Sequence, residues 1–254
     1  MLFYFTGTGN SLYAAKRIEE NPISIPQVMH QELNFKDERI GIVAPIYGHE
    51  VPTMVKEFMK NAHFETDYFY MILTYGNRHG GASELAKKLC DEYGIKVNYI
   101  QTLLMVDNFL LAFDMDEQRK IDKQIDSQLQ KITTDIKNKI DEIQSVTDID
   151  RDAHRQFLEN RKKMPADAFT NLYKVTEACV HCGICTKVCP AGCIHIEGDK
   201  VLYDTDKCQS CMACIHNCPQ KAIQLLLGEK NSKARYRNEH ITLQEIIKAN
   251  QQNK

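Results

Sequence analysis

The sequence predicts an α/β protein in two parts: a doubly wound parallel sheet of five strands and a small α+β cysteine module. Through the first half of the chain, short apolar runs alternate with helical stretches, as strands buried on both faces of a parallel sheet do. Nine of the ten cysteines lie between Cys179 and Cys218. They therefore belong to one local site rather than to a disulfide framework.

Strands are expected where apolar runs are short, and helices where turns bearing Gly or Pro open longer amphipathic stretches. The expected strands cover residues 2–5, 39–46, 68–74 and 96–106, with a weaker one at 23–28. The expected helices cover residues 11–20, 52–62 and 82–93. After the last strand, seven apolar residues recur at steps of three or four: Ile121, Ile125, Leu129, Ile132, Ile136, Ile140 and Ile143. They predict one helix of about six turns, which packs on the sheet or, as a less favoured alternative, on a coiled-coil partner.

Composition and charge limit the classes of function. The 254 residues carry 32 Lys+Arg and 34 Asp+Glu, a formal net charge of -2, which argues against a nucleic-acid partner. No apolar run is long enough to span a membrane, and Met1 is not followed by a signal-peptide pattern. We therefore expect a cytoplasmic protein, in which clustered cysteines usually serve metal or redox chemistry.

Changes in composition along the chain suggest four segments. Residues 1–150 would form the sheet domain, and residues 151–174 a polar, partly helical connector that docks through its aromatic side chains. The cysteine module would occupy residues 175–227, followed by a basic C-terminal tail at 228–254. The basic flanks could dock on the module or on an acidic partner, or could form an ordinary solvated surface.

The cysteines form an internal repeat with a period of 29 residues. The halves read Cys179-x2-Cys182-x2-Cys185-x3-Cys189-Pro190 and Cys208-x2-Cys211-x2-Cys214-x3-Cys218-Pro219. Structural zinc sites use separated pairs of ligands instead, so the spacing favours iron–sulfur clusters. It resembles that of bacterial ferredoxins with two clusters, whose fourth cysteine binds the other cluster. The resemblance implies that one 4Fe-4S cluster is held by Cys179, Cys182, Cys185 and Cys218, and the other by Cys208, Cys211, Cys214 and Cys189.

Two cysteines fit no ligand position in this pattern. Cys193 lies four residues after Cys189, and Cys90 lies on an apolar helical face. We expect both to be small buried packing residues.

A glycine-containing loop follows the first expected strand and reads Thr6-Gly7-Thr8-Gly9-Asn10-Ser11. Leu12 stands where a dinucleotide fingerprint has a third glycine, and the lysine of a P-loop is absent. Hydroxyls, an amide and the free N–H groups of a helix start predict a phosphate-binding loop. The pattern resembles the flavodoxin phosphate signature, with Ser11 where threonine is commoner. The resemblance implies that Thr6, Thr8, Gly9, Asn10 and Ser11 bind the phosphate of FMN.

Two further loops follow strands at the same expected edge of the sheet, where doubly wound folds bind ligands. By the same resemblance, Tyr47 would stack on the flavin in the loop that starts at Pro45, and Gly48 would present its peptide to the ring. The loop after the next strand would complete the site with Thr74, Tyr75, Gly76, Asn77 and Gly81. His49 is a proton-donor candidate or an ordinary loop histidine. Asp107 and Asn108 follow the last strand without an assigned role.

Taken together, the chain resembles the fused flavodoxin-ferredoxin proteins of anaerobic bacteria and archaea. The resemblance implies a flavodoxin-like flavoprotein that relays electrons between FMN and two 4Fe-4S clusters, to or from a redox partner protein or a small electron acceptor. Two alternatives stay open: an FMN-dependent reductase of a small organic substrate, with His49 or Tyr75 as proton donor, and a redox sensor that responds to cluster loss. The sequence assigns no firm catalytic residue, and leaves the oligomeric state open.

Overall fold

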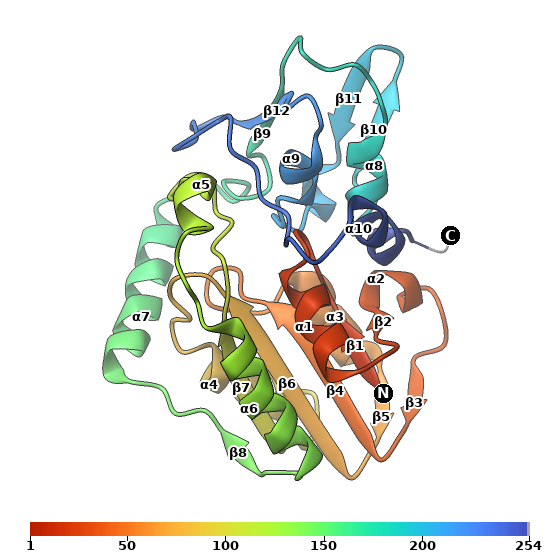
Figure 1. Cartoon of the computed structure of the whole chain (residues 1–254), viewed down its shortest axis with the longest axis vertical. Helices are drawn as coiled ribbons and strands as arrows, with labels where there is room; N and C mark the ends of the chain where they lie inside the picture. Colours follow the sequence, from red (N-terminus) through yellow and green to blue (C-terminus); the bar gives the residue numbers. More distant parts are fainter. Residues whose placement is uncertain (253–254) are drawn as a thin grey trace.

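The computed structural model describes residues 1–252, which form a sheet domain with a smaller cysteine module above it (Figure 1). The sheet has six strands in the order β2-β1-β4-β6-β7-β8, and every pair in it is parallel. When the five strands other than β8 are numbered 1 to 5 along the chain, their order in the sheet is 2-1-3-4-5, which is a doubly wound order. The strands are β1 (Leu2–Tyr4), β2 (Ile23–Ser24), β4 (Arg39–Pro45), β6 (Tyr68–Tyr75), β7 (Tyr99–Leu104) and β8 (Glu142–Ile143).

Helices cover both faces of the sheet because its central strands β1, β4 and β6 are buried on both sides. One core contains Leu2 and Tyr4 of β1 with residues of α1 (Asn10–Ile18) and α6 (Ile125–Lys137). The other contains Phe3 of β1 with residues of α3 (Thr53–Asn61) and α4 (Ala82–Glu92). The expected strands at 2–5, 39–46, 68–74 and 96–106 and the first three expected helices are thus confirmed, whereas the expected strand at 23–28 is a strand only over Ile23–Ser24 and continues as a short helix. The short helix α2 (Ile25–Val28) and a two-stranded parallel sheet, β3 (Asn34–Lys36) with β5 (His63–Glu65), complete this domain.

The prediction of a five-stranded sheet and of one six-turn helix after it is wrong. The helix α6 has 13 residues and ends where Lys139 adopts a positive φ of 50°. There the N–H groups of Lys139 and Ile140 donate to the carbonyls of Ile136 and Asp135, a Schellman termination. The chain then returns to the sheet, where Ile143 pairs with Ile100 as part of the sixth strand.

The cysteine module consists of two small antiparallel sheets and two short helices. Strand β9 (Tyr173–Val175) pairs with β12 (Ile223–Leu225), and β10 (Ile194–Glu197) pairs with β11 (Lys200–Tyr203). Each half of the cysteine repeat contributes one helix, α8 (Ile184–Val188) or α9 (Ala213–Asn217). A 3-10 turn, Thr205–Lys207, precedes the second half. The module lies beyond the carboxyl ends of β1, β4 and β6 (Figure 1).

Three further helices connect the two parts. Helix α5 (Met115–Gln118) lies between β7 and α6 in the sequence, and α7 (Asp148–Lys162) runs along the side of the molecule (Figure 1). Helix α10 (Leu243–Asn250) lies within the segment expected as a tail. It buries Ile246 and Ala249 and contacts both α2 and α8. None of the helices within residues 1–252 has the length and apolar character needed to cross a membrane.

Candidate functional site

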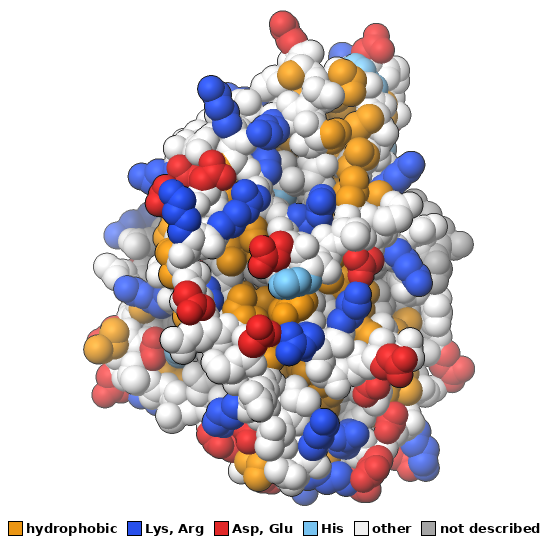
Figure 2. All heavy atoms as spheres, in the orientation of Figure 1, with side chains coloured by type: hydrophobic (Ala, Val, Ile, Leu, Met, Phe, Trp, Pro, Cys, Tyr) orange, Lys and Arg blue, Asp and Glu red, His pale blue; other side chains and the backbone are white. Residues whose placement is uncertain are grey.

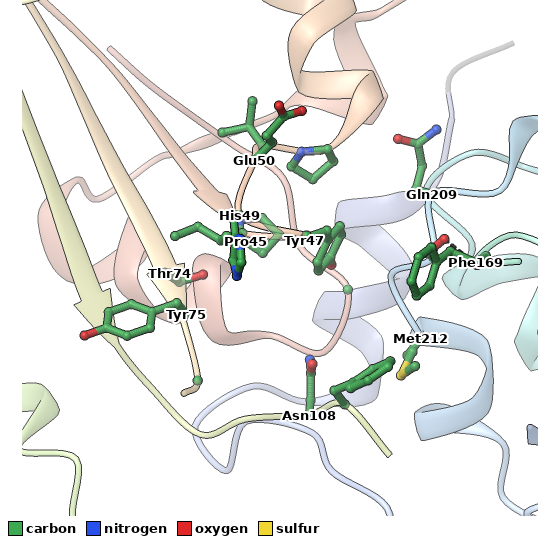
Figure 3. A pocket seen from close by; sticks show the side chains of 18 of the residues that line it. Pro45, Tyr47, His49, Glu50, Thr74, Tyr75, Asn108, Phe169, Gln209 and Met212 are labelled. Carbon is green, nitrogen blue, oxygen red and sulfur yellow. Dashed lines mark hydrogen bonds between the residues drawn. The ribbon is translucent and has the colours of Figure 1, made fainter. Parts of the chain in front are cut away.

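A cavity of 650 Å³ lies at the carboxyl ends of the strands, between the sheet domain and the cysteine module (Figure 3). Its walls come from the loops after β1, β4, β6 and β7, from α7 and the turn that follows it, and from the cysteine loop that contains Cys208. The cavity is thus built by segments that lie far apart in the sequence. Its size falls within the usual range for small-molecule and cofactor sites.

The N-terminal loop, residues 6–11, forms one end of the cavity with neutral donors. The hydroxyl of Thr6 accepts the N–H of Gly9 at 3.1 Å, and the hydroxyls of Ser11 and Thr74 lie 2.9 Å apart. Helix α1 begins directly after Gly9 with no side-chain cap and no acidic residue in its first turn. Its free N–H groups and its dipole therefore favour an anion at this end.

The C-terminal segment, residues 228–252, fixes the side chain of Asn10 in this loop. The Oδ1 of Asn10 accepts the hydroxyl of Tyr236 at 2.6 Å and the amide of Asn238 at 3.2 Å. The backbone N–H of Asn238 also donates to the carbonyl of Thr8 at 2.9 Å. Gly9, where an added Cβ would lie 3.1 Å from Cβ atoms of Asn238 and Ile241, faces this segment rather than the cavity.

A second chain of hydrogen bonds links the N-terminal loop to the cysteine module. The amide of Asn108 donates to the hydroxyl of Thr8 at 2.6 Å, and the carbonyl of Asn108 lies 2.8 Å from Nε2 of His216 on α9. Nδ1 of His216 accepts the N–H of Tyr236 at 2.9 Å, so Nε2 carries the proton and donates to Asn108. Burial lowers the pKa of His216 to about 4, which keeps this histidine neutral.

The loops after β4 and β6 provide flat and aromatic groups. Tyr47 and Glu50 exchange backbone hydrogen bonds of 2.8 and 3.2 Å, which closes a tight turn over Gly48 and His49. Burial, with the nearby thiols of Cys211 and Cys208, raises the pKa of Tyr47 well above its usual value, so its hydroxyl stays protonated. In Figure 3 the Tyr75 ring points away from Tyr47 and Phe169.

Eleven of the thirteen residues that the sequence suggested for FMN line this one cavity. They are Thr6, Thr8, Asn10, Ser11, Pro45, Tyr47, Gly48, Thr74, Tyr75, Gly76 and Asn77. Gly9 and Gly81 do not line it; Gly81 has a φ of 82° and precedes α4 as its N-cap. His49, the proton-donor candidate, also lines the cavity.

Sequence reasoning missed the side of the cavity formed by residues outside the sheet. Phe157 of α7 lies against Gly48, where an added Cβ would be 2.7 Å from its ring. The guanidinium of Arg161 stacks 5.3 Å from the ring centroid of Phe169, and both residues line the cavity. The aromatic residues of the connector, residues 151–174, indicated that this segment docks on another part of the chain. The local sequence did not indicate which part.

The cysteines of the repeat gather around two hollows, each of which mixes residues from both halves. The outer hollow is lined by Cys179, Cys182, Cys185 and Cys218, and the inner hollow by Cys208, Cys211, Cys214 and Cys189 together with Cys193. Within residues 1–252, no three His, Cys, Asp or Glu side chains form a site for a single metal ion. A four-iron cluster differs from such a site because each thiolate binds a different iron atom.

The inner hollow shares a wall with the cavity. Cys208, Gln209 and Met212 line both spaces. The carbonyl of Cys211 lies so close to Gly7 that a Cβ on this glycine would overlap it. The outer hollow shares no lining residue with the cavity, and Cys182 at its rim is exposed.

The two remaining cysteines are buried. Cys90 packs in the core beside Met71, with the two sulfur atoms 3.6 Å apart. Cys193 lies on the inner hollow, with its Sγ 3.3 Å from Sγ of Cys189.

Comparison with known proteins identifies only the cysteine module. A family model described as a 4Fe-4S dicluster domain matches residues 171–219. A ferredoxin described as 7Fe from Hydrogenibacillus schlegelii is 42% identical over 53 residues, which are 20% of this chain and 68% of that protein. Pyruvate synthase subunit PorD of Methanothermobacter marburgensis is 39% identical over 49 residues, 19% of this chain and 57% of the subunit.

Larger relatives share the same stretch. A protein of the ion-translocating oxidoreductase complex of Methanosarcina acetivorans is 47% identical over 47 residues, and the chain covers 18% of that protein. The formate dehydrogenase iron-sulfur subunit of Wolinella succinogenes is 42% identical over 50 residues, with 25% of that subunit covered. No solved structure matches the chain.

Proposed function

Because the chain belongs to the 4Fe-4S dicluster ferredoxins through residues 171–219, we propose that it relays electrons between an FMN in the cavity and two 4Fe-4S clusters. An external redox partner, either a protein or a small electron acceptor, completes the path. Iron–sulfur electron transfer follows from the family, and the flavodoxin-like FMN domain is the further step of the proposal. The strand order of the sheet supports that step.

The cysteines at each hollow are the proposed cluster ligands. Cys179, Cys182, Cys185 and Cys218 hold the outer cluster, and Cys208, Cys211, Cys214 and Cys189 hold the inner one. The crossing of the fourth cysteine between halves agrees with the spacing rule of two-cluster ferredoxins and with the residues at each hollow.

Residues at both ends of the cavity support FMN as its ligand. The N-terminal loop offers hydroxyls, an amide and uncapped helix N–H groups to a phosphate without a cationic side chain. Tyr47, Gly48 and the loop after β6 provide the flat surfaces and peptide groups for a ring. When bound, FMN can exchange one or two electrons, whereas each cluster exchanges one.

The wall shared by the cavity and the inner hollow is the observation that carries the proposal. Cys208 is a proposed ligand of the inner cluster and lines the cavity at the same time. A ligand ring in the cavity would therefore be adjacent to the inner cluster. The outer cluster, beside exposed Cys182, would face the external partner.

Flash reduction of the FMN-loaded chain tests the relay. After reduction of the flavin, its absorbance and that of the clusters are followed without oxygen. The proposal expects the clusters to be reduced at a rate that does not depend on protein concentration. In Cys211→Ser, which removes a ligand of the inner cluster, this phase should disappear while FMN remains bound. Cluster reduction that scales with concentration in the unmodified chain would overturn the proposed relay within one chain.

FMN and riboflavin form a matched pair of ligands for the N-terminal loop. Since riboflavin lacks the phosphate, FMN should bind at least about tenfold more tightly. Thr8→Val should reduce this difference, while Thr134→Val on the exposed surface of α6 should not. Equal affinities for both ligands in the unmodified chain would contradict the proposed phosphate site.

A reductase of a small organic substrate is the second candidate function. It is favoured by the part of the cavity under α7, where Phe157, Arg161 and Phe169 lie beyond the loops that would hold FMN. Saturable oxidation of the reduced flavin by an organic acceptor would support this function. Oxidation that rises linearly with every acceptor tested would favour the relay.

A further inference from the structure

Two histidines meet at the edge of the cavity. Nδ1 of His49 lies 3.3 Å from Nδ1 of His154 on α7, and both imidazoles are half-buried. One hydrogen fits between these two nitrogens, so one ring donates and the other accepts. His49 lines the cavity, whereas His154 lies behind it on the helix. In Figure 3 His49 stands among Pro45, Tyr47 and Thr74.

The packing around His49 holds its imidazole in place beside His154. His49 adopts a positive φ of 75°, and its imidazole packs against Gly80, where a Cβ would overlap the ring. Phe157 covers it from α7, with ring centroids 5.1 Å apart. A non-glycine residue with positive φ in a packed loop is a constrained arrangement, typical of functional sites.

Helix α7 presents one face to this region. Asp150, His154, Phe157 and Arg161 recur at steps of four, three and four, so they share a face of the helix. Asp150 lies 3.7 Å from Nε2 of His79. Phe157 and Arg161 line the cavity. His154 thus lies on the face of α7 that contacts the loops after β4 and β6.

We propose that His154 and His49 form a proton-transfer route from solvent to the ligand in the cavity. The route rests on the proposed function, since it serves the protonation of a cofactor or substrate that receives electrons through the clusters. The outer ends of the pair are available for this role: within the part of the chain that the structure describes, Nε2 of His49 and Nε2 of His154 have no protein hydrogen-bond partner.

One proton enters and one leaves in each transfer. His49 gives its Nε2 proton to the ligand as His154 gives its Nδ1 proton to Nδ1 of His49. His154 then takes a proton from water at Nε2. Both rings end in the other neutral tautomer, and no net charge remains on the pair. The electrons arrive separately, through the clusters from a low-potential one-electron donor, and the reduced ligand accepts the proton.

Burial and neighbouring groups keep His49 in its neutral form. Burial lowers the pKa of His49, and the nearby groups of His154, Arg78 and His79 lower it further, while Asp150 on α7 acts in the opposite direction. A neutral imidazole is therefore the ordinary state of His49 near pH 7, as the two-tautomer transfer requires.

Nitrogen-15 NMR of the chain without FMN provides a first test that does not depend on activity. The unmodified chain should show one shared Nδ1 hydrogen between His49 and His154 and a His49 pKa below about 6.5. In His154→Gln, the His49 pKa should rise, because the neighbouring imidazole is gone. Independent titration of the two rings, with no change in His49 when His154 is replaced, would overturn the proposal.

Stopped-flow reduction of the FMN-loaded chain provides the second test. With dithionite as the electron donor between pH 6 and pH 9, His154→Gln should slow the proton-dependent phase of flavin reduction about tenfold. Its solvent isotope effect should change, while the reduction of the clusters should not. His63→Gln, at an exposed residue of β5, is the matched control and should behave as the unmodified chain.

The outcomes separate this inference from the proposed function. Failure of FMN to bind the unmodified chain would refute the flavin proposal, and the NMR test would still decide whether the histidines share a proton. Normal FMN binding and electron transfer, with rates and isotope effects unchanged in His154→Gln, would refute the proton route alone.

Discussion

At the residue scale, the contact between Gly7 and Cys211 is the narrowest point between the two parts. Gly7 does not have a positive φ, so its role comes from close packing rather than from an unusual backbone conformation. Any side chain here must displace the backbone of the cysteine loop, because a Cβ would overlap the carbonyl of Cys211.

Gly7→Ala should therefore disturb both proposed cofactors. We expect about tenfold weaker FMN binding and slower transfer between FMN and the inner cluster, because the two loops must separate. Fluorescence titration of FMN and flash reduction measure these effects. Gly198→Ala is a useful comparison: it strains a φ of 57° but meets no atom within 4 Å, and should change stability without changing either readout.

Cysteine substitutions distinguish ligands from packing residues. Cys211→Ser should lower the iron content from about eight to about four atoms per chain, because the inner cluster loses a ligand. Cys90→Ser, in the core of the sheet domain, should leave the iron content unchanged and lower stability only. Equal iron in Cys211→Ser and the unmodified chain would contradict the ligand assignment.

The sequence could suggest the proposed cluster cysteines because their spacing is a local property of two short loops. Eleven suggested cavity residues were likewise found from three loops that follow buried strands. Asn108, His154 and Phe157 could not be assigned, because their roles depend on contacts across 100 to 109 residues of chain. The spacing of residues within one segment does not indicate such long-range contacts.

At the element scale, the C-terminal segment supports the N-terminal loop of the cavity, although none of its own described residues lines the cavity. Its hydrogen bonds to Asn10 and Thr8 hold the N-terminal loop, and its helix α10 docks between the two parts. Charge counting could not show this, because Arg235 is buried against Glu229 at 2.6 Å instead of being solvated.

Tyr236→Phe tests the link between this segment and the proposed phosphate site. Loss of the hydrogen bond to Asn10 leaves its Oδ1 with the weaker contact from Asn238. We expect FMN affinity to fall roughly fivefold, since a single hydrogen bond contributes about 1 kcal/mol. Riboflavin affinity should change less, and a larger loss for riboflavin than for FMN would contradict the link.

Glu245 anchors α10 through a capping box with Thr242 and an ion pair of 2.6 Å with Lys16. The hydrogen bond from Lys16, followed by those from Thr242, lowers the pKa of this carboxyl to about 2. The carboxylate therefore stabilises the fold fully above its unfolded pKa of about 4.5, and this contribution is lost as the pH falls toward 2.

Glu245→Gln should lower the free energy of unfolding by about 1 kcal/mol at pH 7, a value limited by partial solvent exposure. The difference from the unmodified chain should be the same at pH 5 and should shrink below pH 4. Denaturant unfolding at each pH measures it. A difference that grows as the pH falls would contradict this assignment.

The strands β1, β4 and β6 were predictable because both of their faces are buried, which leaves uninterrupted apolar runs such as 68–74. The end of α6 was not, because the isoleucine period continues past Lys139 while the backbone turns at that residue. The turn is determined by pairing of β8 with β7, which is a tertiary contact.

At the scale of the whole molecule, the lining of the cavity and of the two hollows suggests an order for the proposed cofactors: FMN, then the inner cluster, then the outer cluster. The cavity borders the inner hollow, and the outer hollow has exposed Cys182 at its rim. On the face shown in Figure 2, Lys and Arg alternate with Asp and Glu rather than forming a patch of one sign. We therefore expect no strong long-range electrostatic steering of a partner toward this face.

The order of the cofactors predicts a different effect for each cluster. Loss of the outer cluster in Cys182→Ser should stop reduction of an external protein acceptor but leave transfer between FMN and the inner cluster intact. Flash reduction and a steady-state assay with an added ferredoxin-type acceptor separate the two steps. Equal loss of both steps, with the inner cluster still present, would contradict this order.

The presence of FMN beside two clusters is tested by anaerobic quantification of iron, acid-labile sulfide and FMN per chain in one preparation supplied with FMN. About 8 iron, about 8 sulfide and about 1 FMN per chain are expected. The same iron and sulfide with no bound FMN would contradict this expectation, because the cavity beside the inner cluster would then hold a different ligand or none.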